Sequence, residues 1–288
     1  MENDMKDIME ILIAGGDMRQ LFCAERLADK YGVSVIGFDP DLIPEGLSPA
    51  AGSKRFGCIV LPMPPLDENG LVNAPCYSGS LGIEELAEKL APGGLILAGK
   101  ADTRLAEAFT GSDIITYMDR EDLQLRNAVP TAEGAVQLAL EELPVTLSGL
   151  PVLIVGMGRI GIALAEILKG FGAEVTAAVR SRSSAAKAHL HGVKYTYIEG
   201  FSDRYALVFN TAPEMVFDRT MLEKSGRDTL FIDLASRPGG IDFEAAAELG
   251  RKAVWALGIP GKTAPVTAGE IVADTIAGIL AERGAGDE

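Results

Sequence analysis

The chain has 288 residues, 48% of them hydrophobic, which is enough to bury two cores of ordinary size. Its 26 basic and 41 acidic residues give a formal net charge of -15. This charge argues against nucleic acid or an anionic membrane as a partner, although a local basic pocket still suits a small anion. No apolar run approaches the roughly 20 residues that span a bilayer.

The N-terminus and the cysteines indicate the cellular location of the protein and the role of its thiols. The acidic start Met1-Glu2-Asn3-Asp4 has neither the basic nor the apolar segment of an export signal, so we expect a cytoplasmic protein. Cys23, Cys58 and Cys76 are odd in number and widely spaced, which predicts neither a disulfide framework nor a metal site. We expect packed, inert thiols.

Short runs of Val, Ile and Leu alternate with amphipathic segments along nearly the whole chain. This alternation is typical of βα units that build parallel sheets covered by helices. In the first half the predicted strands are 8–14, 33–38, 58–61, 95–98 and 114–116, and the predicted helices are 18–30 and 83–90. Residues 62–75, rich in Pro, Asn and Gly, predict one long loop.

The second half repeats the pattern. The predicted strands are 152–155, 174–179, 194–198, 207–210, 230–233 and 253–255. Between the halves, 127–134 predicts a rigid connection in which Thr131 caps a helix at 135–142. A last helix at about 267–282 has no strand after it, and we expect it to pack back on the first domain.

A buried strand, a glycine-rich turn and a helix follow one another near residue 156. The turn reads Gly156-Met157-Gly158-Arg159-Ile160-Gly161, the fingerprint of dinucleotide-binding folds. Gly156 permits a tight turn, Gly158 lets a pyrophosphate approach the backbone, and Gly161 lets helix and strand pack closely. The helix N-terminus adds amide donors. We predict a dinucleotide site here; the alternative is a structural turn with incidental glycines.

The residues after the second strand of this domain indicate which dinucleotide binds. NAD-specific sites usually carry an acidic residue about 20 residues beyond the fingerprint. This chain has none there and reads Arg180-Ser181-Arg182 instead, whose guanidinium and hydroxyl groups suit a 2′-phosphate. We predict NADP, with NAD as the alternative cofactor; a solvated surface pair of arginines is the competing interpretation.

Two further loops follow the carboxyl ends of predicted strands, where open α/β sheets bind ligands. We expect both loops to border the nicotinamide half of the cofactor. Their candidate residues are Asn210, Thr211, Ala212 and Pro213 in the first loop and Asp233 and Ala235 in the second. For Thr211 and for Ser236, an ordinary turn or cap is the alternative.

These elements predict an α/β protein with two Rossmann-like, doubly wound parallel-sheet domains separated by a cleft, in a formate or glycerate dehydrogenase-like arrangement. The predicted substrate-side domain comprises residues 1–127, with the C-terminal helix 265–288 packed back on it. The predicted NADP-binding domain comprises residues 128–264.

The first strand also runs into a glycine turn and a helix, Gly15-Gly16-Asp17-Met18-Arg19-Gln20. A third glycine is missing, so a second dinucleotide is not expected. A glycine turn at a helix N-terminus still suits a carboxylate or phosphate, to which Arg19 adds a bidentate contact. A plain structural turn capped by Asp17 is the alternative.

Cations and small residues in several segments indicate a dicarboxylate substrate. The predicted substrate-binding residues are Gly15, Gly16, Asp17, Arg19, Gln20, Thr131, Ser236, Arg237, Gly239 and Gly240, and the catalytic candidates are Glu133 and Lys262. The two histidines, His189 and His191, fall near the end of a helix in the cofactor domain. The His-carboxylate pair of 2-hydroxyacid dehydrogenases is therefore not expected.

At these residues the chain resembles the A-subunit family of dipicolinate synthases, from endospore-forming bacteria. The resemblance covers nearly the whole chain through motifs at 15–20, 129–134, 156–161, 233–243 and 260–269. The most specific motif is Asp233-Leu234-Ala235-Ser236-Arg237-Pro238-Gly239-Gly240-Ile241-Asp242-Phe243, because Rossmann proteins at large do not share it.

The resemblance implies NAD(P)-linked oxidation of dihydrodipicolinate, or of a hydroxylated precursor that loses water, to pyridine-2,6-dicarboxylate in the mother cell of a sporulating bacterium. It also implies a partner, the flavoprotein-like B subunit. A homodimer and a hetero-oligomer are both compatible with the sequence. Arg19 and Arg237 would bind carboxylates, and Glu133 or Lys262 would accept a proton.

Two other functions fit the same site residues. One is another two-domain NADP dehydrogenase of a keto or imino acid, similar to shikimate or alanine dehydrogenase. The other is a non-catalytic, NADP-binding regulatory subunit. The first leaves the 233–243 motif unexplained.

Overall fold

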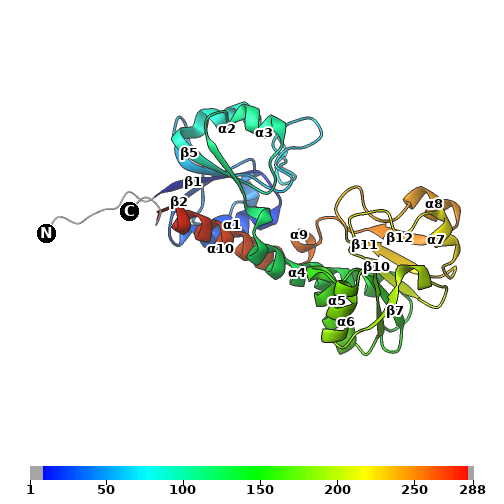
Figure 1. Cartoon of the computed structure of the whole chain (residues 1–288). Coiled ribbons are helices and arrows are strands. Elements are labelled where there is room, and N and C mark those ends of the chain that lie inside the picture. The colour runs from blue at the N-terminus through cyan, green and yellow to red at the C-terminus, as the bar shows by residue number, and fades with distance from the viewer. Residues whose placement is uncertain (1–8, 285–288) are drawn as a thin grey trace. The chain divides into compact units, whose positions relative to one another are not determined.

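The computed structural model describes residues 9–284 and divides the chain into two compact units (Figure 1). Unit 1 is formed by Met1–Arg126 and Ala264–Glu288, and unit 2 by Asn127–Thr263. Three parts of the sequence-based predictions lie outside the described residues: the acidic start at Met1 to Asp4, Ile8 of the first predicted strand, and residues 285–288 of the C-terminal segment.

Unit 1 contains a six-stranded parallel sheet with the spatial order β3-β2-β1-β4-β5-β6. Its strands are β1 Glu10–Ala14, β2 Gly32–Ile36, β3 Ser48–Pro49, β4 Phe56–Val60, β5 Leu90–Ala98 and β6 Asp113–Thr116. The strand order reverses between β1 and β4. Open α/β sheets bind their ligands beyond the carboxyl ends of the strands at this reversal.

Helices cover both faces of this sheet. They are α1 Met18–Ala28, α2 Ile83–Lys89, α3 Thr103–Ala108, the first turns of α4 Glu121–Glu142, and α10 Pro265–Gly284, with 3-10 turns at Pro40–Leu42 and Tyr117–Asp119. The C-terminal helix α10 packs against α1 (Figure 1). The approach is close because a Cβ atom placed on Gly269 would lie 2.6 Å from the carbonyl oxygen of Arg19.

Unit 2 repeats the same topology with a second six-stranded parallel sheet, in the order β12-β11-β10-β7-β8-β9. Its strands are β7 Pro151–Val155, β8 Glu174–Val179, β9 Lys194–Tyr197, β10 Leu207–Asn210, β11 Leu230–Asp233 and β12 Lys252–Trp255. Its helices are the rest of α4, α5 Arg159–Gly170, α6 Arg182–Leu190, α7 Arg219–Glu223, α8 Phe243–Glu248 and α9 Ile259–Thr263, with a 3-10 turn at Ile198–Gly200. The predicted α/β class with two doubly wound parallel sheets is confirmed.

Each sheet separates two hydrophobic cores. In β7, Val152 and Ile154 face one core while Leu153 and Val155 face the other. In β1, Ile11 and Ile13 face the core beneath α1 and α10, and Leu12 faces the opposite one. Because a strand covered on both faces has no polar side, these strands are continuous apolar runs.

The prediction for residues 127–134 is wrong in one respect. The segment is not a connection capped by Thr131, because α4 runs without a break from Glu121 to Glu142 with Pro130 inside it. Thr131 Oγ1 instead donates to the carbonyl oxygen of Asn127 within the helix, at 2.7 Å. A helix-internal proline costs about 3 kcal/mol, and we attribute the continuity to burial of the apolar face that Ala132, Ala135, Val136 and Ala139 contribute to the unit 2 core.

The long loop predicted at residues 62–75 is present. Between β4 and α2 the chain forms a single bridge, Leu66 with Val72. From residue 9 to residue 284, no helix is both long and apolar enough to cross a membrane.

Candidate active site

The glycine turn of unit 2 follows β7, next to the reversal of strand order. A Cβ atom on Gly156 (φ +94°) would lie 2.7 Å from Thr211 Oγ1, and one on Gly161 would lie 2.1 Å from the carbonyl oxygen of Gly156. Within the described part of the chain, nothing lies within 4 Å of a Cβ placed on Gly158. The outer glycines therefore permit tight packing, whereas Gly158 faces open space that a pyrophosphate can enter.

The helix after this turn is suited to an anion. Helix α5 begins at Arg159, and among the described residues no side chain caps its N-terminus, where Gly158 is the N-cap. Its first amides and its dipole therefore favour a negatively charged group. Met157 is 2% exposed and packs in the core, so its side chain does not face a cofactor. The turn fits a dinucleotide through its backbone.

The loop after β10 lies beside this turn. The amide and the hydroxyl of Thr211 both donate to the carbonyl oxygen of Val155, at 3.1 and 2.7 Å. Thr211 thus joins the ends of β7 and β10, as neighbouring parallel strands allow. Ala212 and Pro213 follow it, and Pro213 is exposed.

The side chains of Asp233 and Asn210 are fully buried at the ends of β11 and β10. Asp233 Oδ1 accepts from Asn210 Nδ2 at 2.7 Å and from the Ala235 amide at 3.1 Å, and its Oδ2 accepts from the Gly240 amide at 2.7 Å. Sequence reasoning placed both residues among the cofactor contacts. Their side chains instead support the two loops from inside.

The Ser236 to Gly240 loop folds over this buried carboxylate. A Cβ atom would lie 2.8 Å from Asp233 Oδ2 if placed on Gly239 and 2.3 Å from Asn210 Nδ2 if placed on Gly240. Both glycines are thus explained by packing. Ser236 and Arg237 are exposed on the loop.

A tryptophan that the sequence reasoning did not single out positions Arg237. The guanidinium carbon lies 5.7 Å from the centre of the Trp255 ring, within cation–π range. The indole Nε1 donates to the carbonyl oxygen of Ala235 at 3.0 Å, and its ring stacks on Phe243. Trp255 therefore joins the 233–243 loop to β12 and supports the arginine.

The predicted phosphate-binding residues follow β8. Ser181 caps α6, since its hydroxyl accepts from the Ser184 amide at 3.1 Å. Arg182 is exposed at the start of α6. Arg180 forms an ion pair with Glu214 from the loop after β10, a residue that sequence reasoning missed because 34 positions separate the two.

The glycine turn of unit 1 is covered by its own loop. The Gly16 amide donates to the carbonyl oxygen of Asn73 at 2.7 Å, and a Cβ atom on Gly15 would lie 2.8 Å from Val72 Cγ1. Both glycines have positive φ values, +63° and +96°. The loop carbonyl takes an amide that an open turn would offer to a ligand, in agreement with the missing third glycine.

Asp17 and Arg19 contact each other in this turn. Asp17 caps α1, and its two oxygens also accept from Arg19 Nε and Nη2, each at 2.8 Å. The bidentate edge of Arg19, predicted to hold a substrate carboxylate, is thus occupied by Asp17. Gln20 is buried beside the pair, in a small hollow that Gly16 and Tyr117 also line.

The catalytic candidates lie on two helices of unit 2 that touch. A Cβ atom on Gly134 of α4 would lie 2.5 Å from Thr263 Oγ1 of α9. Glu133 and Lys262 are both exposed. Thr131, predicted to bind substrate, is buried with its hydroxyl committed within α4.

Other titratable groups lie elsewhere. His189 is in the last turn of α6 and His191 follows the helix, as predicted. Burial raises the pKa of Cys58 to about 12 and raises that of Cys23 further, while Cys76 is half-buried. The prediction that these thiols are packed is confirmed for Cys23 and Cys58, and their inertness stays a prediction.

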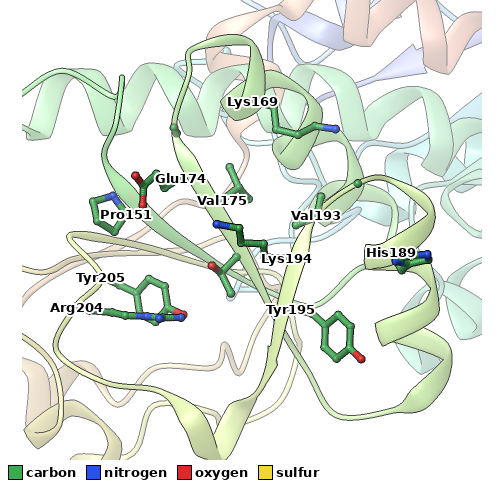
Figure 2. A pocket seen from close by; sticks show the side chains of 13 residues that line it. Pro151, Lys169, Glu174, Val175, His189, Val193, Lys194, Tyr195, Arg204 and Tyr205 are labelled. Atoms are coloured by element: carbon green, nitrogen blue, oxygen red, sulfur yellow. The ribbon is translucent and has the colours of Figure 1, made fainter.

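A hollow of about 950 Å³ in unit 2 is not the dinucleotide site (Figure 2). It lies at the amino ends of the strands, since Pro151, Glu174 and Lys194 in its wall are the first residues of β7, β8 and β9. The glycine turn is at the opposite, carboxyl end of β7. Figure 2 shows that Arg204 and Tyr205 border the same hollow.

Comparisons with known proteins agree with this geometry. Residues 10–118 match the N-terminal domain of the dipicolinate synthase A subunit, and residues 123–251 match the NAD binding domain of D-isomer specific 2-hydroxyacid dehydrogenases. The dipicolinate synthase A subunit of Bacillus subtilis (strain 168) is 28% identical over 95% of this chain and 96% of its own length.

Solved structures extend the comparison. The crystal structure of the dipicolinate synthase A subunit from Bacillus halodurans has 31% identity and a TM-score of 0.87, covering 95% of this chain and 98% of that one. The transhydrogenase from Sinorhizobium meliloti has 17% identity and a TM-score of 0.71 over 94% of this chain and 93% of its own, which shows the fold alone.

Two doubly wound parallel sheets, one with an open glycine turn after its first strand, define an oxidoreductase of the dehydrogenase fold that uses a nicotinamide cofactor. The N-terminal match and the 31% identity narrow that class. The chain belongs to the A-subunit family of dipicolinate synthases.

Proposed function

We propose that this chain is the dehydrogenase subunit of a dipicolinate synthase. It oxidises dihydrodipicolinate, or a hydroxylated precursor that first loses water, to pyridine-2,6-dicarboxylate with NADP as hydride acceptor. The observation that carries the proposal is the open glycine turn at Gly158 next to the buried Asp233 network, in a chain whose Bacillus relatives are named as A subunits of dipicolinate synthase.

The cofactor is held by unit 2. The Gly158 turn and the N-terminus of α5 bind the pyrophosphate, and Arg180 and Arg182 bind the 2′-phosphate. The loops at Thr211 and Ala235 border the nicotinamide. When bound, the nicotinamide supplies the hydride acceptor, which no side chain of the protein can replace.

The substrate is a ring that carries two carboxylates. Arg237 of unit 2, supported by Trp255, is one candidate to bind a carboxylate. The Gly16 turn of unit 1 is a separate candidate. Aromatisation of the ring supplies driving force, so the protein mainly orients a ring C–H bond and removes one proton. Glu133 and Lys262 are the candidate acceptors of that proton.

The family name also supports a proposal about partners. The Bacillus relatives are named as one subunit of dipicolinate synthase. We infer a complex with a flavoprotein-like B subunit in the mother cell of a sporulating bacterium. The chain itself forms a homodimer or joins a hetero-oligomer with that subunit.

Turnover of purified components tests the function. The chain is mixed with NADP or NAD and with enzymatically generated dihydrodipicolinate, with and without the B subunit. We expect reduction of NADP together with formation of pyridine-2,6-dicarboxylate, followed by nicotinamide absorbance and by mass spectrometry. Absence of both products in every mixture, or turnover of keto or imino acids in their place, would overturn the proposal.

A further inference from the structure

One buried amide of unit 1 has no hydrogen-bond partner among residues 9–284. Gln20, in the first turn of α1, is 4% exposed, and its Nε2 atom has no hydrogen-bond partner among the described residues. Buried polar side chains in native proteins are nearly always hydrogen-bonded, because an unpaired donor has lost its water without replacement. An unpaired amide at this position therefore points to a ligand that accepts a hydrogen bond.

The backbone of the turn determines where this amide points. Side chains on a helix lean toward its N-terminus, so Gln20 reaches back over the glycine turn. A Cβ atom on Gly16 would lie 2.3 Å from Gln20 Cγ and 3.0 Å from Pro62 Cβ. The missing side chain at Gly16 thus makes room for the glutamine stem. Gly16, Gln20 and Pro62 all line one hollow of about 40 Å³.

The charges around the hollow favour a small anion. Asp17 and Arg19 also line it, but they pair with each other and largely cancel. The N-terminus of α1 carries a partial positive charge that favours an anion. The hollow has about 40 Å³, which is enough for a water molecule or another small polar group. This size suits a small group such as a carboxylate.

We propose that Gln20 is a specificity-determining residue, whose Nε2 donates a hydrogen bond to one carboxylate of the substrate. The identity of that carboxylate as the substrate's rests on the proposed function. The Asp17–Arg19 pair holds the turn in shape, and the neutral amide of Gln20 supplies the donor that the occupied edge of Arg19 does not.

Binding of the reaction product to two variants tests this role. Gln20→Met keeps the unbranched stem and removes the amide, and Gln20→Glu replaces the donor with a carboxylate. We expect Gln20→Met to weaken binding of pyridine-2,6-dicarboxylate between about 10-fold and 100-fold, as loss of a hydrogen bond to a charged group does. Gln20→Glu weakens it further by repulsion. Isothermal titration calorimetry measures both affinities, with NADP affinity unchanged.

Thermal unfolding supplies a readout that a merely structural role would not give. Gln20→Met removes an unpaired donor, so the unfolding temperature without ligand does not fall. The matched control is Gln124→Met. This variant lowers the unfolding temperature, because Gln124 Nε2 donates to the carbonyl oxygen of Met118 at 2.6 Å. The exposed Gln137→Met is the control for product affinity and leaves it unchanged.

The outcomes separate this inference from the proposed function. If Gln20→Met binds the product as tightly as wild type does, the amide serves only buried water and the inference fails. If wild type neither binds nor forms the product, formate and acetate are used as probes at matched ionic strength. If these anions raise the unfolding temperature of wild type but not that of Gln20→Met, the anion site is supported and the proposed substrate is wrong. Stabilisation that is absent or independent of Gln20 overturns the site.

Discussion

Arg180 lies between two partners of like charge, the carboxylate of Glu214 and, in our proposal, the 2′-phosphate of the cofactor. The ion pair with Glu214 is half-exposed, so it contributes little to stability and can be exchanged for a phosphate. Ser181 caps α6, so the 2′-phosphate contacts in our proposal are assigned to the two arginines. In the proposed site, the choice between NADP and NAD therefore depends on single residues.

Replacement of Arg180 and Arg182 together by Ala tests that choice. Loss of charge-assisted contacts to the 2′-phosphate weakens NADP binding by roughly 10-fold or more, while NAD, which lacks this phosphate, is little affected. A titration of intrinsic fluorescence or calorimetry gives both affinities. Equal losses of affinity for NADP and NAD would show that the arginines do not bind the 2′-phosphate.

Glu214→Gln is the matched variant, and we expect it to change NADP affinity in the opposite direction. Removal of the competing carboxylate frees Arg180, and we expect NADP to bind up to about fivefold more tightly, the range of an exposed ion pair. NAD affinity stays unchanged. Weaker NADP binding in this variant would show that Glu214 helps to bind the cofactor and does not compete with the 2′-phosphate for Arg180.

Asp233 is another single residue on which the structure depends, because its carboxylate accepts three hydrogen bonds. In Asp233→Asn an amide group faces at least one backbone N–H, so a donor opposes a donor in a fully buried position. We expect a loss of about 1–3 kcal/mol in the free energy of unfolding and weaker NADP binding. Urea denaturation measures the loss. Asp218→Asn is the control and is nearly neutral, because Asn caps a helix as well as Asp does.

At the scale of elements, the two strand–turn–helix segments after β1 and β7 show how one local pattern gives two kinds of site. After β7, no side chain of the described residues caps the helix N-terminus, and none of their atoms lies within 4 Å of a Cβ placed on the central glycine. After β1, Asp17 caps the helix and the 62–75 loop covers the turn. The first arrangement suits a pyrophosphate; the second leaves a hollow for a single small group.

Two glycine variants of the β7 turn separate packing from ligand approach. In Gly161→Ala the new methyl group would lie 2.1 Å from the carbonyl oxygen of Gly156, so α5 must shift and both stability and NADP affinity fall. Gly158→Ala meets open space, so the unfolding temperature changes little while NADP binding is lost. Thermal unfolding and NADP titration of both variants check this. Retained NADP binding in Gly158→Ala would contradict the site.

At the scale of the whole molecule, each unit has its own sheet and its own cores, and the chain passes between the units at residues 126–127 and 263–264. A ligand held by one unit stabilises that unit directly, by RT ln(1 + [L]/Kd). The effect of each ligand should therefore be strongest within the unit that binds it.

Hydrogen exchange with and without NADP tests this division. At about 100 times its Kd, NADP adds about 2.7 kcal/mol to the stability of the state that binds it. We expect added protection in 127–263, strongest near Gly158 and Thr211, and much less near Gln20. Mass spectrometry of peptides from both units measures it. Protection centred on the unit 1 turn would contradict the assignment of the cofactor to unit 2.

Much of the fold and part of the candidate site followed from local sequence. Strands such as β8, β10 and β11 begin and end where the apolar runs do, because a strand buried on both faces must be continuously apolar. The Gly156 turn was identifiable for a similar reason, since its steric demands fall within six consecutive residues. The extent of α4 was missed because burial of its apolar face, a tertiary effect, keeps the helix intact through Pro130.

By itself the sequence determined the α/β class, the positions of most strands and the dinucleotide turn, all of which depend on residues near one another in the chain. Tertiary structure alone decided that Asp233 supports loops, that Asp17 pairs with Arg19 and that Glu214 pairs with Arg180. It also decided that the Gln20 amide is buried with no partner in the described part of the chain. The physical reason is that hydrogen-bond satisfaction and burial depend on all neighbours in space. Many of those neighbours come from distant strands and loops.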